Sequence, residues 1–296
     1  HYEYLLEKPD MEQIISLQRA RFERVFTALL AILSGVILIL LAVQGPLFLD
    51  HIHYKTAEII NNQLLGQDIV NLLVLAPLLI AGGISLLLKK RYAIYLLLMA
   101  PLYLIYYVLS YTIGWEWSSK LYTGNNEKWF FHFLFILISS VIILFYALAE
   151  FPEKVQSHFK RKHLLIYTLL NLFFMLIFAG MWISEVREVI ATGTARGYDI
   201  APTAFWLVRV FDLGFTIPLG ILSIYLLWTR PDTTFPVQFM FYGFFLTMII
   251  AVNAMGVIML LNNDPTFLFR DLSVFLILGA IISFGFGFIL KNYRTT

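Results

Sequence analysis

Two short stretches of this 296-residue chain place ionisable and amide side chains at helical spacing. GQDIVN holds Asp68 and Asn71 three residues apart, and VRVFD holds Arg209 and Asp212 three residues apart. Side chains at this spacing are neighbours on a helix face. Because both stretches lie within or beside long apolar runs, their charges are costly unless they face protein or water. Each stretch therefore predicts either part of a ligand-binding site or a polar tie between helices, and both alternatives stay open.

Further polar residues extend this prediction to other parts of the chain. Tyr103, Tyr107 and Tyr111 follow one another at steps of four, His132 lies near the start of an apolar run, and Asn253 lies inside another. Buried hydroxyls need partners, so we expect Tyr103 and Tyr107 to line a cavity together with the acids. The predicted ligand-binding residues are Asp68, Asn71, Tyr107, His132, Arg209, Asp212 and Asn253.

The sequence gives little support to metal, cofactor or enzyme chemistry. The absence of cysteine excludes disulfides, thiolate metal sites and iron–sulfur clusters. His51 and His53 beside Asp50 are a weak metal signal, because no further ligands follow at a recognisable spacing. With His132 as the sole histidine in an apolar run, a haem held by two membrane histidines is not expected. Because no apolar run holds a lysine for a retinal Schiff base and no nucleophile stands out, we predict no cofactor, metal or catalytic residue.

The elements that position these residues are transmembrane helices. Hydrophobic residues make up 60% of the chain, charged residues 14%, and the mean hydropathy is +0.79. A soluble domain carries about 25% charged residues, and a membrane helix needs about 20 apolar ones. The fold class predicted is an all-α polytopic membrane protein. Its eight predicted spans are 25–44, 69–88, 92–113, 129–149, 164–184, 203–228, 235–261 and 272–290.

The basic residues predict the orientation of these spans. Eight spans place 14 Lys and Arg on the side that contains both termini and 7 on the other side. The positive-inside rule then places both termini in the cytoplasm. The protein is expected in the inner or plasma membrane of the cell. Residues 1–24 are predicted as a cytoplasmic N-terminal segment whose helix is capped by Asp10. That helix is either amphipathic and lies on the inner leaflet, or it extends the first span.

A repeat is predicted from the two spans that carry the acids. Asp68 is followed by Pro77, and Asp212 is followed by Pro218. Residues 25–150 and 164–296 would then hold four spans each, separated by a cytoplasmic loop at 151–163. Four is an even number, so the halves would have the same orientation in a parallel repeat. Chance placement of aspartate and proline is the alternative.

The same two spans resemble a known group of proteins. The runs GQDIVNLLVLAPLLI and VRVFDLGFTIPLGILSIYLLW are similar to a family of bacterial multi-pass membrane proteins with a Gly-Gln-Asp start to one span and a later span with Asp and Pro. The resemblance covers about a third of the chain. It implies a multi-pass helical fold and a role for Asp68 and Asp212, and it implies no particular activity.

These observations favour a membrane protein that binds or transports a small solute or a lipid headgroup. The site would be one outward-facing vestibule that contains Asp68 and Asp212, with Arg209 or Arg270 as countercharge. The alternative is a non-catalytic accessory or scaffolding subunit of a larger membrane complex. The expected partners are the lipid bilayer, a small ligand or another membrane protein, and no nucleic acid. A cavity that approaches the middle of the membrane would favour transport, and a solid bundle would favour a scaffold.

Overall fold

A computed structural model describes residues 11–151 and 155–295. Within these residues eight helices are long and apolar enough to cross a membrane, which confirms the predicted fold class. The spans are Ile15–Gln44, Glu58–Leu87, Ala93–Ile113, Asn126–Ala149, Arg161–Thr192, Pro202–Thr229, Phe235–Leu261 and Phe269–Asn292.

Several spans are built from more than one helical segment. The first four spans consist of α1 (Met11–Gln44), η1 (Glu58–Ile60) with α2 (Asn61–Val70), η2 (Asn71–Leu75) and α3 (Ala76–Leu87), then α4 (Ala93–Leu98) with α5 (Pro101–Ile113), and η3 (Asn126–Trp129) with α6 (Phe130–Ala149). The last four consist of α7 (Arg161–Thr192), then α8 (Pro202–Phe211) with η4 (Asp212–Thr216) and α9 (Ile217–Thr229), then α10 (Phe235–Leu261) and α11 (Phe269–Asn292). Two short strands, β1 (Val155–Ser157) and β2 (Tyr293–Thr295), pair antiparallel.

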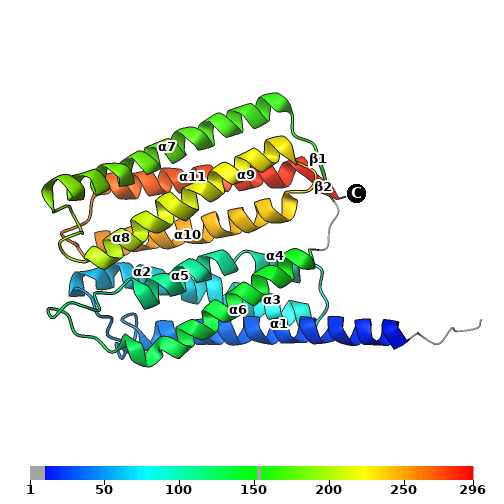
Figure 1. Cartoon of the computed structure of the whole chain (residues 1–296), viewed down its shortest axis with the longest axis horizontal. Coiled ribbons are helices and arrows are strands. Elements are labelled where there is room, and N and C mark those ends of the chain that lie inside the picture. Colours follow the sequence, from blue (N-terminus) through cyan, green and yellow to red (C-terminus); the bar gives the residue numbers. More distant parts are fainter. Residues whose placement is uncertain (1–10, 152–154, 296) are drawn as a thin grey trace, which may run out of the picture.

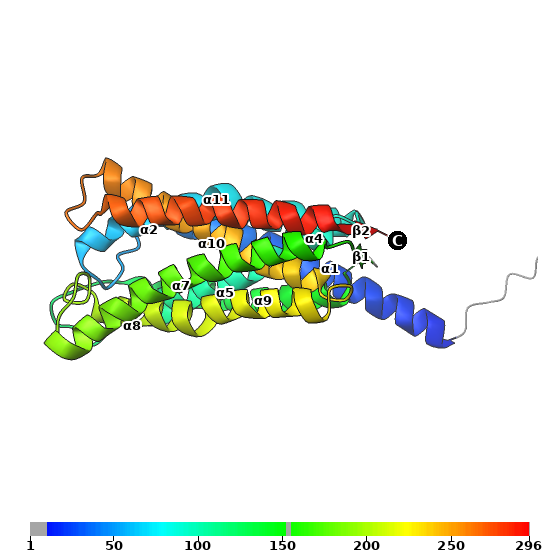
Figure 2. The same ribbon diagram turned by 90° about the horizontal axis from the view of Figure 1, so that it is seen from above.

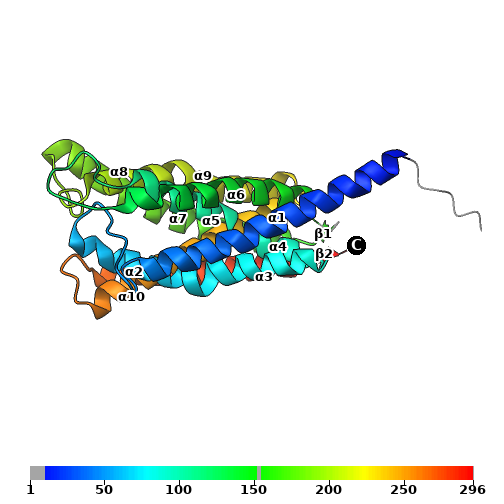
Figure 3. The same cartoon turned by 90° about the horizontal axis from the view of Figure 1, so that it is seen from below.

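The helices run side by side and form two layers (Figure 1). The start of α1 and the end of α11 lie at the same end of the bundle, which we call the terminal face. The opposite end, which we call the loop face, carries the loops 45–57, 114–125, 193–201 and 262–268. Helix α1 crosses the first layer and continues beyond the terminal face without a break from Met11 (Figure 3). The N-terminal helix is therefore an extension of the first span, and the predicted cap Asp10 lies outside the described residues.

The two layers correspond to the two predicted halves and share one order of neighbours. In the first half, consecutive spans pack together and α6 closes on α1. In the second half, α7 packs between α8–α9 and α11, and α10 joins α9 to α11 (Figure 2). The main contact between the halves is α2 against α10. This shared order is what a parallel repeat requires.

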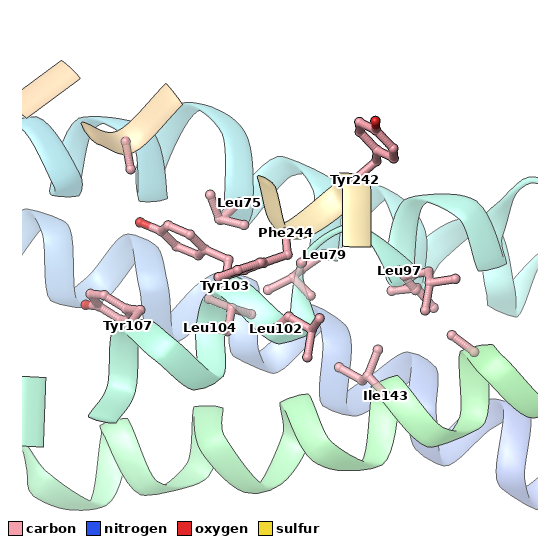
Figure 4. Close-up of a cluster of buried hydrophobic side chains, with 14 of the residues drawn as sticks. Leu75, Leu79, Leu97, Leu102, Tyr103, Leu104, Tyr107, Ile143, Tyr242 and Phe244 are labelled. Atoms are coloured by element: carbon pink, nitrogen blue, oxygen red, sulfur yellow. The ribbon is translucent and has the colours of Figure 1, made fainter. Parts of the chain in front are cut away.

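Packing differs strongly between the halves. In the most apolar windows of the first three spans, 50 to 67% of the residues are buried, whereas in spans five to eight the share is 17 to 22%. The largest fully buried side chains gather around α3, α5 and α6, with Phe244 of α10 added from the second half (Figure 4). The first half is therefore a closed core, and the second half presents most of its side chains outward or into internal space.

The two acid-bearing spans share a backbone irregularity. In η2 the Ala76 N–H bonds to the Asn71 carbonyl, and in η4 the Ile217 N–H bonds to the Asp212 carbonyl. These are π-helical bonds across five residues, and each wide turn directly precedes a proline. Proline clashes with the carbonyl four residues earlier in a regular α-helix, and a wider turn relieves that clash. When the two π-helical turns are aligned, Asn71 is equivalent to Asp212. Asp68, one turn earlier, is therefore equivalent to Arg209.

Candidate functional site

Asp68 lies in the closed first half. The second span begins at Glu58, so Asp68 is inside the helix rather than at its start, and its side chain is 1% exposed. It faces protein, as a charged group in a membrane span should. None of the ion pairs formed within the described residues includes Asp68. The expected countercharges have other partners, since Arg209 pairs with Glu185 and Arg270 with Asp271.

Tyrosines surround Asp68 on the side of α5. The Tyr103 hydroxyl donates to Asn71 Oδ1 over 3.0 Å and accepts from Gln67 Nε2 over 3.3 Å. The rings of Tyr103 and Tyr107 are stacked with centroids 6.3 Å apart, and their hydroxyls point in the same direction (Figure 4). Tyr54, from the loop after α1, meets this row from the loop face, where it contacts Tyr111 and stacks on Trp115.

This group of residues has unsatisfied polar atoms in its interior. We call it the closed cluster, and it consists of Tyr54, Gln67, Asp68, Asn71, Tyr103, Tyr107 and Tyr111. Within it, Asp68 Oδ2, Asn71 Nδ2 and the hydroxyls of Tyr54 and Tyr111 are buried without a hydrogen-bond partner. Buried polar groups are rarely left unpaired in native proteins. The unpaired polar atoms of the closed cluster can therefore bind a ligand, an ion or water.

Asp212 has a different environment in the second half. It accepts hydrogen bonds from Trp182 Nε1 over 2.9 Å, Thr216 Oγ1 over 3.3 Å and the Tyr106 hydroxyl over 3.5 Å. Its side chain is 8% exposed. Three donors from three different spans hold the carboxylate in place, and Trp182 on α7 is the donor that sequence reasoning missed.

A chain of alternating charges lies between Asp212 and the loop face. Arg209 pairs with Glu185, Arg196 pairs with Asp271 and lies 4.0 Å from Glu185, and Arg270 also pairs with Asp271. The Arg209 guanidinium also covers the Trp182 and Phe205 rings at 4.3 and 3.8 Å. We call Arg209, Glu185, Arg196, Asp271 and Arg270 the charge chain. Arg196 comes from the loop 193–201, so its position depends on how that loop folds, and the sequence carries no local signal for it.

A cavity of about 450 Å³ opens beneath the charge chain. Its walls come from α7 to α11, with α2 and α5 on the side of the first half. Arg196 lies at one end of it, and Ser223 and Tyr242 lie at the other. Because the sixth span runs from Pro202 to Thr229, the cavity passes the middle of that span. Most of its lining is apolar, and its other polar side chains include Gln67, Tyr106, Asn171, Arg209, Asp212 and Thr216.

The structure does not bring all seven predicted residues together at one cavity. Of the seven predicted residues, Arg209 and Asp212 line the cavity, whereas Asp68, Asn71 and Tyr107 belong to the closed cluster. The two sites meet along α2 and α5, where Gln67 and Tyr111 of the closed cluster also line the cavity. On α5, Tyr103 bonds to Asn71 of the closed cluster and Tyr106 bonds to Asp212.

The remaining two predicted residues lie outside both sites. Asn253 of α10 donates to the backbone carbonyls of Ile249 and Phe275 and so ties α10 to α11. His132 of α6 packs its ring on Trp129 at 5.2 Å. Neither side chain lines the cavity.

The described residues contain no group of three or more metal-ligating side chains. His53 lies 3.6 Å from Asp50, and His51 instead contacts the Gln44 side chain.

No family model, curated protein or solved structure matches the chain. The resemblance to the bacterial multi-pass family stays a prediction.

Proposed function

We propose that the protein binds a lipid-like amphiphile in the cavity of its second half, with the polar headgroup at Arg209 and Asp212. The observation that carries this proposal is the cavity itself. It is largely apolar, and its charged side chains gather toward the loop face. Ligand pockets commonly measure roughly 300–1,000 Å³ and combine an apolar lining with a few placed polar groups. The 450 Å³ found here lies within that range.

The charges at the cavity favour a headgroup that carries both signs or neither. The lining charges are Arg196, Arg209, Asp212 and Asp271, two of each sign. The arginines are already paired with acids, so a singly charged anion would have to displace one of those acids. A zwitterionic or neutral polar headgroup would find donors and acceptors together beside Arg209 and Asp212.

Transport is the extension of this proposal. The cavity reaches past the middle of the sixth span, as a transport site must. Two polar contacts lie at its far end, the Tyr167–Tyr242 hydroxyl pair and the bond from Ser223 to Gln238. Release toward the terminal face would require these contacts to part.

The accessory-subunit alternative rests on the outer surface of the second half. Spans five to eight leave most of their residues unburied, so they offer a broad apolar flank to lipid or to a partner protein. A scaffold, however, has no need for a deep internal cavity. The cavity therefore favours ligand binding over the scaffolding role.

A matched pair of substitutions tests the proposal. Ala204→Phe places a phenyl group in the cavity lining, whereas Ala280→Phe makes the same change at an exposed position outside it. Native mass spectrometry of the detergent-purified protein with a lysophosphatidylcholine should show binding to the wild type and to Ala280→Phe. Ala204→Phe should weaken binding at least about tenfold, because the pocket volume is lost.

Equal lipid binding by all three proteins would contradict the cavity site. In that case, a partner that co-purifies with the wild type in a fixed ratio would support the accessory role instead.

The orientation follows from the charge bias and is part of the same proposal. The loop face would lie outside the cell, so the ligand headgroup would enter from the outer side. The chain has no cysteine, so single cysteines report accessibility cleanly. A membrane-impermeant maleimide should label Thr123→Cys on the loop face and leave Gln156→Cys unlabelled in intact cells, and the reverse result would invert the orientation.

A further inference from the structure

The closed cluster meets the end of α1 at Gly45. A methyl group built on the Gly45 Cα would lie 2.9 Å from Asp68 Oδ2, 3.0 Å from the Leu41 carbonyl oxygen and 3.8 Å from the Ala42 carbonyl oxygen. A carboxylate oxygen and two main-chain oxygens therefore converge on the bare face of one glycine. Oxygen atoms that face each other repel unless a proton or a cation lies between them.

The end of α1 also leaves a carbonyl without its helical donor. The Leu41 carbonyl accepts the Gly45 N–H over 2.8 Å. The next carbonyl, Ala42, would bond to the residue four positions later, but that residue is Pro46 and has no N–H. A helix C-terminus carries partial negative charge. Both features favour a cation beside Asp68.

Two tyrosine oxygens complete the surroundings. The hydroxyls of Tyr54 and Tyr111 are buried without a hydrogen-bond partner, and the two rings are in edge-to-face contact with centroids 5.1 Å apart. The polar side chains of the closed cluster besides Asp68 are Gln67 and Asn71 on its own helix, Tyr54 from the loop after α1, and Tyr103, Tyr107 and Tyr111 on α5. None of them carries a positive charge.

We propose that Asp68 Oδ2, the Ala42 carbonyl and the hydroxyls of Tyr54 and Tyr111 bind a monovalent alkali cation, with Na⁺ as the best fit. Hard cations take oxygen ligands, and helix C-terminal carbonyls coordinate Na⁺ in broken membrane helices. One buried carboxylate without a countercharge balances one positive charge. A divalent or transition metal would need more acids or histidines than the described residues bring together here. Tyr111 also lines the second-half cavity, so the two sites adjoin, but the proposed cation ligands include none of the residues assigned to the headgroup.

The test measures the stability of the ligand-free protein against Na⁺. Thermal unfolding of the detergent-purified full chain is followed while NaCl replaces choline chloride at constant ionic strength. Above the dissociation constant, each tenfold rise in Na⁺ should lower the apparent unfolding constant of the wild type about tenfold. Asp68→Asn should abolish this response. Glu116→Gln, which alters another buried acid on the loop face, should keep it.

Further variants keep the test informative should Asp68→Asn fail to fold. Tyr54→Phe and Tyr111→Phe each remove one oxygen and should raise the Na⁺ concentration for half-maximal effect about tenfold, and Gly45→Ala should block the site. An identical Na⁺ response in the wild type and in all these variants would overturn the proposal. So would a wild-type stability that depends on pH but not on Na⁺ or K⁺, because the carboxyl would then hold a proton instead.

Discussion

The two halves of the molecule place one backbone feature in opposite surroundings. Both have a π-helical turn directly before a proline, with Asn71 at the start of one turn and Asp212 at the start of the other. In the first half Asn71 of the turn is buried in the closed cluster, and in the second half Asp212 and Thr216 of the turn line a cavity. The turn therefore widens the helix in both halves, and neighbouring side chains decide whether the space gained is filled.

Individual glycines of the two halves illustrate this difference in packing. In the first half, Gly66 lies against the α10 backbone and Gly83 against the α1 backbone, with distances of 2.5 and 2.7 Å from an added methyl carbon to the nearest main-chain atom. In the second half, an added methyl group at Gly180 or Gly214 would meet nothing within 4 Å. Small residues allow close helix contact in membranes only where a partner helix uses the space.

The largest predicted effect compares two of these glycines. Gly66→Ala should destabilise the protein by about 3 kcal/mol, because the methyl group meets the Met255 backbone at 2.5 Å and the main contact between the halves must separate. Gly214→Ala should be neutral or stabilising by up to about 1 kcal/mol, since alanine favours the helix and nothing obstructs it. Thermal midpoints of the two purified variants measure the contrast. Equal losses would mean that the second half is packed as tightly as the first.

The sequence is sufficient for features that depend on local pattern and not for those that depend on contacts between distant residues. Runs of apolar residues define the eight spans, and the cost of a lipid-exposed carboxylate correctly predicts that Asp68 faces protein. The separation of Asp68 from Asp212 depends on which face of α5 meets which neighbour, and hydropathy carries no such information. Arg196 of the loop 193–201 meets Asp271 at the start of α11 only through the tertiary fold, because two spans of the chain lie between these residues.

A second prediction compares the charge chain with an exposed ion pair. Arg209 and Glu185 are 12% and 14% exposed. Arg209→Gln should therefore cost about 2 kcal/mol, because it leaves the largely buried Glu185 carboxylate with only its 4.0 Å contact to Arg196. Adding Glu185→Gln should restore most of that loss. Arg19→Gln on α1, whose pair with Glu23 is 79% and 44% exposed, should cost less than about 0.5 kcal/mol.

Chemical unfolding of the single and double variants in detergent gives the coupling free energy between Arg209 and Glu185. A double variant less stable than Arg209→Gln alone would show that Glu185 has a stabilising role of its own. The pairing of Arg209 with Glu185 would then not distinguish the second half from the first half, where Asp68 has no ion-pair partner.

The smallest predicted effect concerns the link between the halves at the terminal face. Strand β1, in the loop that joins them, pairs with β2 at the chain end, and the Ser157 N–H and Oγ both donate to Asp232 Oδ1 over 2.9 and 2.7 Å. These bonds hold the pKa of Asp232 below its ordinary value. A carboxyl with a lowered folded-state pKa stabilises the fold above its unfolded-state pKa, and the contribution is lost as the pH falls through the folded-state pKa. Ser157→Ala removes the hydroxyl donor, so the pKa of Asp232 should rise toward its ordinary value. The thermal midpoint of this variant should then fall slightly less than that of the wild type between about pH 5 and pH 3.

The control is Thr233→Ala, which removes a neighbouring exposed hydroxyl that bonds to the Arg230 carbonyl instead of Asp232. This variant should follow the wild-type pH profile. Because Asp232 is fully exposed, the difference will be small, and identical profiles for all three proteins would mean that the Ser157 hydroxyl does not lower the pKa of Asp232.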